Sequence, residues 1–176
     1  MMKKLVSWCL LAVLGLSLCL SAPAEEASAS LCFNKTVWGM GKAQVRWLMG
    51  VKPYQEPVGM TGYAVLVYRT KVEGYRCVMQ YAFVPGDALD SMEIIVDDGD
   101  VDFYDLMNEK FTEQYGEPLT EDQADPASEN VAAAVMAECM RTVGGEDFLA
   151  WQADGETVIV MCLNDVGCYV EFMRCA

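Results

Sequence analysis

The chain contains no histidine among its 176 residues, and this absence removes several classes of active site. Without imidazole there is no Ser-His-Asp or Cys-His nucleophile arrangement and no zinc site that needs a histidine ligand. Cationic residues are also scarce, since 12 Lys and Arg stand against 26 Asp and Glu, a formal net charge of −14. Such a protein lacks the cationic surface that displaces counterions from nucleic acid or binds anionic lipid. We therefore expect neither nucleic acid nor a lipid surface as its partner.

Residues 1–24 have the order of a secretory signal peptide. Two lysines precede an apolar run over residues 5–20, and small residues follow it, with cleavage expected after Ala24. The run is short for a spanning helix of about 20 residues, and Leu18 stands where a lipid anchor at Cys19 needs a small residue. We expect an exported protein, secreted or periplasmic, without a lipid anchor or a stable membrane span. Residues 25–31 would be a mobile leader and residues 32–176 a single domain.

Six cysteines remain after this cleavage, and no two of them have the Cys-x-x-Cys spacing that lowers a thiol pKa in redox enzymes. An even number of cysteines in an exported chain predicts structural disulfide bonds. The sequence does not choose the pairs. Cys139 could bond to Cys77 or Cys162, and Cys162 could bond to Cys168 across the last hairpin. The candidates are Cys32, Cys77, Cys139, Cys162, Cys168 and Cys175.

Hydrophobic periodicity predicts an α+β fold in one domain, an antiparallel β-sheet meander with helices packed on one face. In the meander, Cys77, Met79, Tyr81 and Phe83 alternate with more polar residues and should face the core. Ser128 is the expected cap of the last helix. The predicted helices span residues 38–50, 101–115 and 129–141, and the predicted strands span residues 63–71, 75–83, 89–96, 148–151, 157–163 and 168–174. These form three regions: residues 38–96, then two helices and an acidic linker over 101–141, then C-terminal strands over 148–175.

Residues 38–96 resemble a known family pattern. Gly39-Met40, then Gln44-Val45 and Leu48-x-Gly50, lead through a proline-bearing loop into a strand with Tyr68 and a second strand over residues 77–83. This order is similar to the SmpA/OmlA (BamE-like) outer-membrane assembly lipoproteins and to the repeats of β-lactamase-inhibitor proteins (BLIP-like). The resemblance implies a helix packed on a small antiparallel sheet, in a non-enzymatic module that holds another protein.

An acidic cluster follows the third predicted strand. Asp98, Asp100, Asp102 and Glu109 have the spacing of oxygen ligands in an EF-hand loop, but Phe103 stands where that loop needs glycine. Acids also gather at helix N-termini because the helix dipole favours them there. Binding of calcium or another cation by Asp97, Asp98, Asp100 and Asp102 is therefore an alternative function. The surrounding residues 97–129 carry twelve acids and one base.

Three aromatic residues could anchor a partner protein: Trp38, Trp47 and Tyr54. The same residues could instead close the core where the first helix meets the sheet. No other constellation indicates a cofactor or catalysis, although a small hydrolase using two carboxylates is a third alternative. The sequence thus favours an exported, disulfide-stabilised, non-enzymatic module that binds another protein through its first helix region or an exposed sheet face.

Overall fold

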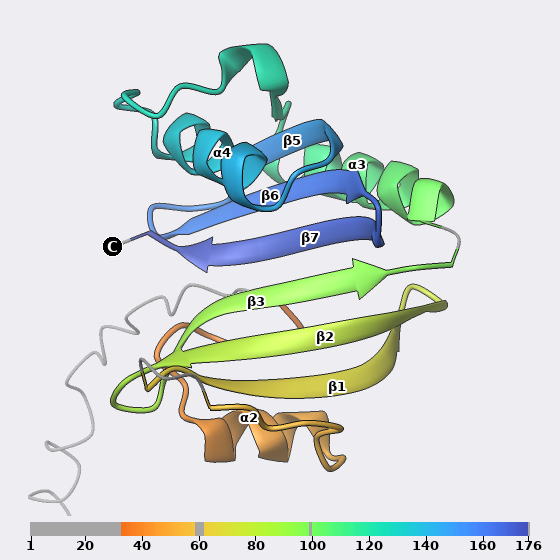
Figure 1. Cartoon of the computed structure of the whole chain (residues 1–176), viewed down its shortest axis with the longest axis vertical. Coiled ribbons are helices and arrows are strands. Elements are labelled where there is room, and N and C mark those ends of the chain that lie inside the picture. Colours follow the sequence, from red (N-terminus) through yellow and green to blue (C-terminus); the bar gives the residue numbers. More distant parts are fainter. Residues whose placement is uncertain (1–32, 59–61, 99, 176) are drawn as a thin grey trace, which may run out of the picture.

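The computed structural model describes residues 33–58, 62–98 and 100–175, and the predicted signal peptide, the leader and Cys32 lie outside these residues. Seven antiparallel strands form one sheet in the order β1-β2-β3-β7-β6-β5-β4 (Figure 1). The strands are β1 (Ala64–Val72), β2 (Tyr75–Val84), β3 (Ala88–Val96), β4 (Leu119–Thr120), β5 (Glu146–Gln152), β6 (Thr157–Asn164) and β7 (Gly167–Arg174). The described helices are α2 (Lys42–Met49), α3 (Asp100–Tyr115), the 3-10 turn η1 (Glu121–Gln123) and α4 (Val131–Thr142).

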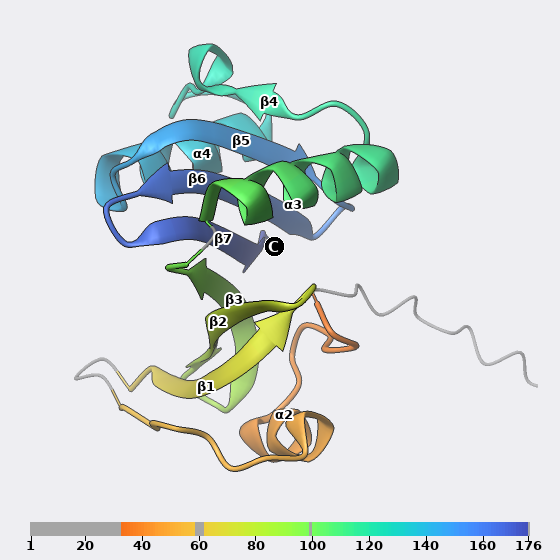
Figure 2. The same cartoon turned by 90° about the vertical axis from the view of Figure 1, so that its right-hand side faces the viewer.

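The sheet consists of two meanders joined edge to edge. Strands β1, β2 and β3 form the first, β5, β6 and β7 form the second, and β3 pairs with β7 from Ser91↔Met173 to Val96↔Cys168. Gly167 makes this junction possible, because its φ is +133° and a Cβ there would lie 1.9 Å from the carbonyl oxygen of Val96. Figure 2 shows how far the first meander is twisted relative to the second.

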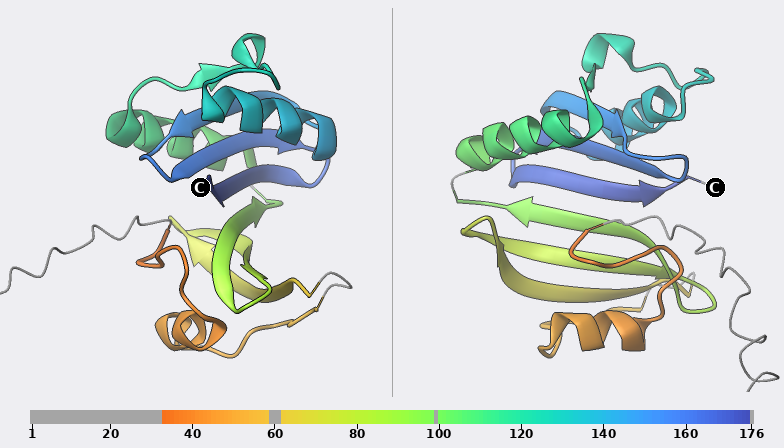
Figure 3. Two further views of the ribbon diagram at one scale, coloured as in Figure 1. Left: turned by 90° about the vertical axis from the view of Figure 1, so that its left-hand side faces the viewer. Right: turned by 180° about the vertical axis from the view of Figure 1, so that it is seen from behind.

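The two faces of the sheet are covered differently. The first face carries the larger core, in which Met79, Tyr81, Ile94 and Phe172 pack with α3 and with the chain before α2 (Figure 3, right). The second face carries a smaller core under α4, which contacts β5 and β6. Strand β6 therefore contributes apolar residues to both cores, which explains its nearly unbroken apolar sequence.

The predicted fold class is wrong in two respects. The molecule is mostly sheet, and α3 and α4 lie on opposite faces of it, so the helices do not pack on one face. The physical reason is that periodicity identifies the apolar side of a helix but not the side of the sheet against which it packs. The predicted antiparallel meander agrees in part with the structure, since consecutive strands pair in both halves of the sheet.

Most of the predicted elements are present, with shifted ends. Cys77, Met79, Tyr81 and Phe83 are buried in the larger core, as the alternation predicts. The last helix begins later than expected, because Asn130 caps it by accepting hydrogen bonds from the backbone of its first turn, and Ser128 instead accepts one from the Asn130 N–H. The short strand β4, paired with β5, has no counterpart in the prediction.

No helix among the described residues has the length and apolar character needed to cross a membrane.

Candidate functional site

Large exposed apolar side chains are concentrated in one stretch of the chain. Of the eight that the described residues contain, five lie within residues 47–63. Trp47, in the last turn of α2, is 81% exposed, and Tyr54 is 55% exposed. We call this set the aromatic surface; its members are Trp47, Val51, Tyr54, Val58 and Tyr63. Isolated exposed apolar residues are ordinary, but five of them on one short stretch of chain make this stretch the candidate interaction site.

The chain that carries the aromatic surface is anchored at α2 and again at residues 54–58. Helix α2 buries Val45 completely in the larger core, and Arg46 forms an ion pair with Glu56 in the segment that follows the helix. That segment adds to the outer edge of β1, where the Tyr54 N–H donates to the Val67 carbonyl at 2.7 Å. Trp47 and Tyr54 therefore project from backbone that is already hydrogen-bonded.

The three aromatic residues predicted as partner-binding separate into two groups. Trp47 and Tyr54 are exposed members of the aromatic surface, whereas Trp38 packs against the larger core. The Trp38 Nε1–H donates to the Thr157 Oγ1 at 2.8 Å and so connects the start of the domain to β6. Trp38 thus has the core-closing role that the sequence left open, and Trp47 and Tyr54 remain candidates for partner binding.

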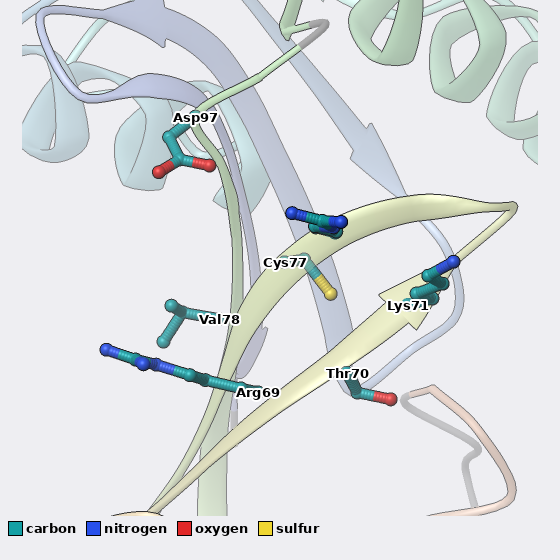
Figure 4. Close-up of a pocket in the computed structure, with 7 residues that line it drawn as sticks. Arg69, Thr70, Lys71, Cys77, Val78 and Asp97 are labelled. Atoms are coloured by element: carbon teal, nitrogen blue, oxygen red, sulfur yellow. The ribbon is translucent and has the colours of Figure 1, made fainter.

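A basic pocket lies next to the aromatic surface, and it was not predicted from the sequence. Its cations are Arg69 and Lys71 on β1 and Arg76 on β2, and it is an open hollow of about 860 Å³ (Figure 4). The Arg69 guanidinium lies 4.0 Å from the centre of the Tyr54 ring, a cation–π contact that joins pocket and surface. The alternation of exposed Arg69 and Lys71 with buried Tyr68 and Val72 was a signal in the sequence that could have revealed it.

The molecule has a marked charge asymmetry. Residues 33–78 contain seven Lys and Arg against two Glu, a net charge of +5, whereas residues 79–176 contain three against 22 acids, a net charge of −19. The positive part comprises α2 and the β1–β2 hairpin, at one end of the sheet, and the negative part includes α3, α4 and β5–β7. The overall charge of the chain therefore hides a cationic end.

Two carboxylates face each other where the halves of the sheet meet. Glu93 on β3 pairs in register with Glu171 on β7, on the second face of the sheet. Burial, reinforced by the Glu171 charge, raises the pKa of Glu93 to about 7. Burial also raises the pKa of Glu171, whose Oε2 accepts a hydrogen bond from the Tyr169 hydroxyl at 2.9 Å. Nothing in the sequence singles out this pair among the 26 Asp and Glu of the chain.

The acidic cluster predicted as a cation site does not converge in the structure. Asp97 and Asp98 follow β3, whereas Asp100 and Asp102 lie in the first turn of α3. Asp100 accepts a hydrogen bond from the Val101 N–H, and Asp97 lines the basic pocket. Within the described parts of the chain, no three acidic or cysteine side chains are grouped as metal ligands. The residues from Asp100 onward are helical and cannot form an EF-hand loop.

The five cysteines within the described residues are free in this structure. Cys162 and Cys168 are on adjacent strands but face opposite sides of the sheet, Cys162 in the smaller core and Cys168 in the larger. Cys139 and Cys175 pack with Cys162 in the smaller core, whereas Cys77 belongs to the larger core. Burial raises the pKa of the Cys139, Cys162 and Cys168 thiols to about 12, so as thiols they would be poor nucleophiles.

No family profile, curated protein or solved structure matches this chain, so the geometry described above carries the functional argument.

Proposed function

We propose that this protein is an exported, non-enzymatic module that binds another protein through its aromatic surface. The observation that carries this proposal is the concentration of exposed Trp47, Tyr54 and three further apolar residues on one short stretch of chain. Aromatic side chains anchor protein interfaces because they bury a large area while losing few rotamers. The BamE-like resemblance of residues 38–96 points to the same kind of role.

The support beneath the aromatic surface favours binding without large rearrangement. Residues 54–58 are hydrogen-bonded to β1, and α2 is fixed through Val45 and the Arg46–Glu56 pair. A partner that covers this surface would therefore lose little free energy to ordering it.

The test is retention of proteins from the native extracytoplasmic fraction on immobilised wild-type protein and on the double variant Trp47→Ala, Tyr54→Ala. We expect the wild type to retain a specific protein and the double variant to lose it, because truncating a Trp or Tyr that acts as an interface hot spot costs about 2 kcal/mol or more of binding free energy. The matched control is Val101→Ala with Val166→Ala, which removes exposed apolar groups outside residues 47–63. Equal retention by all three proteins would contradict the proposal.

Export and disulfide formation belong to the same proposal. Cys139, Cys162 and Cys175 are the best placed to pair after export, since they share the smaller core. A thiol count on the unfolded, exported protein tests this directly. We expect fewer than six reactive thiols, and a full count of six would argue against the oxidising compartment.

A further inference from the structure

The cations of the basic pocket have no carboxylate partner among the described residues. The ion pairs among the described residues use five other cations: Lys42, Arg46, Lys110, Arg141 and Arg174. Arg69, Lys71 and Arg76 are absent from them, although the chain has 26 acids, and Asp97 lines the same pocket without reaching ion-pair distance. Figure 4 shows Arg69 and Val78 extending to the same side of the hairpin. Three exposed positive charges are thus left available around one hollow.

The positions of these cations oppose the stability of the hairpin. Lys71 lies directly opposite Arg76 in the β1–β2 register, and Arg69 is two residues from Lys71 on the same strand. Like charges directly opposite each other on adjacent strands are destabilising. An anionic ligand would relieve this repulsion, so the arrangement is better suited to binding than to folding.

The pocket is also continuous with the aromatic surface and has an apolar component. Arg69 stacks on Tyr54, and Val78, opposite Arg69 in the register, lines the hollow. A ligand that reaches both regions would therefore present negative charges beside apolar groups. A polypeptide with acidic side chains next to apolar ones has this composition.

We propose that Arg69, Lys71 and Arg76 form an anion-binding site that takes the carboxylates of an acidic segment of the partner protein. This proposal rests on the proposed function, because it specifies the chemistry of the partner that covers the aromatic surface. The positive net charge of residues 33–78 favours such a segment locally, and at physiological salt the more distant acids are screened beyond about 8 Å. The site thus binds acidic protein despite the negative charge of the whole chain.

The test is an anisotropy titration of a labelled oligo-glutamate peptide, with an oligo-glutamine peptide as the uncharged comparison. We expect saturable binding of the glutamate peptide alone, weakening as salt is added. The triple variant Arg69→Gln, Lys71→Gln, Arg76→Gln should bind about tenfold more weakly, the combined effect of three exposed charge contacts. The matched control Lys110→Gln, Arg141→Gln, Arg174→Gln changes the net charge equally and should stay within about twofold of wild type.

Folding is checked by thermal unfolding of the triple variant, which should melt no lower than wild type because the Lys71–Arg76 repulsion is gone. If the triple variant does melt lower, the single variant Arg69→Gln, which leaves the Lys71–Arg76 pair intact, replaces it in the titration.

Absence of saturable peptide binding, or an equal loss of binding in the control variant, would overturn the proposal. Tighter binding of heparin or inorganic phosphate than of the peptide would also overturn it, in favour of a glycan or a small anion. If the peptide does not bind but partner retention still depends on Trp47 and Tyr54, this proposal fails and the proposed function stands.

Discussion

At the scale of single residues, the hydroxyl of Tyr68 is a buried polar group without a hydrogen bond to any described residue. The side chain is 1% exposed in the larger core, and its hydroxyl is buried without a hydrogen-bond partner among the described residues. The ring itself packs well, in an edge contact with Tyr81 at 6.0 Å between centroids. A buried hydroxyl without a hydrogen-bond partner costs free energy, because it has lost its hydrogen bonds to water.

We therefore predict that Tyr68→Phe raises the free energy of unfolding by about 1 kcal/mol, because it removes the unsatisfied group and keeps the ring. Chemical denaturation of the purified protein measures the change. Tyr104→Phe is the matched control with the opposite sign, since the Tyr104 hydroxyl donates to the Asp147 carbonyl at 2.6 Å. A loss of stability in Tyr68→Phe would show that this hydroxyl is bonded to a group outside the described contacts.

The tryptophans show how far residue-level prediction could go. Trp38 and Trp47 lie nine positions apart in the same predicted helix, and nothing local distinguishes them. Trp38 packs against the larger core and donates a hydrogen bond to Thr157, a residue 119 positions away in the chain. Contacts of that range are invisible to periodicity, so the sequence could nominate both residues but not separate them.

At the scale of elements, the pairing of β3 with β7 makes stability depend on pH. Glu93 faces Glu171 across this pair, with Gln80 opposite it on β2 and Tyr169 nearby on β7. Because the folded-state pKa of Glu93 is raised to about 7, the folded protein holds this proton where the unfolded chain releases it. The stabilisation is complete below the pKa of about 4.3 expected in the unfolded chain and is lost as the pH rises toward 7.

We predict that the free energy of unfolding falls by about 2 kcal/mol between pH 4.5 and 7.5 through this group, and that Glu93→Gln flattens that part of the profile. Denaturation curves at a series of pH values measure it. Glu113→Gln, an exposed glutamate of α3, is the matched control and should keep the wild-type profile. A Glu93→Gln profile as steep as that of wild type would show that other groups carry the pH dependence.

Element prediction succeeded where local pattern decides and failed where packing partners decide. Alternation alone predicted which side of β2 faces the core, and the apolar stripe over residues 101–115 predicted α3. The side of the sheet that each helix covers did not follow, because both faces of β5–β7 are apolar. The basic pocket was half visible, as alternating cations on β1, but its lack of carboxylate partners is a tertiary property.

At the scale of the whole molecule, one continuous sheet should make the two halves unfold together. Gly167 lies at their junction, where a Cβ would overlap the Val96 carbonyl oxygen. We predict that Gly167→Ala lowers the free energy of unfolding by about 2–4 kcal/mol, since it combines a backbone overlap with a strained φ. The larger core includes residues of both meanders, so the loss should appear in each of them.

Hydrogen exchange measured by mass spectrometry tests both parts of this prediction. Protection should fall in β1–β3 and in β5–β7 alike, whereas Gly155→Ala, where a Cβ meets nothing within 4 Å, should leave both unchanged. A loss of protection confined to β7 and its neighbour would contradict cooperative unfolding of the sheet.

The uneven distribution of charge along the strand order also makes the molecule a permanent electric dipole, with its positive pole at α2 and the β1–β2 hairpin. A charged body that approaches within a few Debye lengths exerts a torque on such a molecule before any contact is made. An acidic partner would turn the β1 end toward itself and keep the α3 and α4 end away. Orientation in solution would thus precede recognition, and adding salt would slow association more than it speeds dissociation.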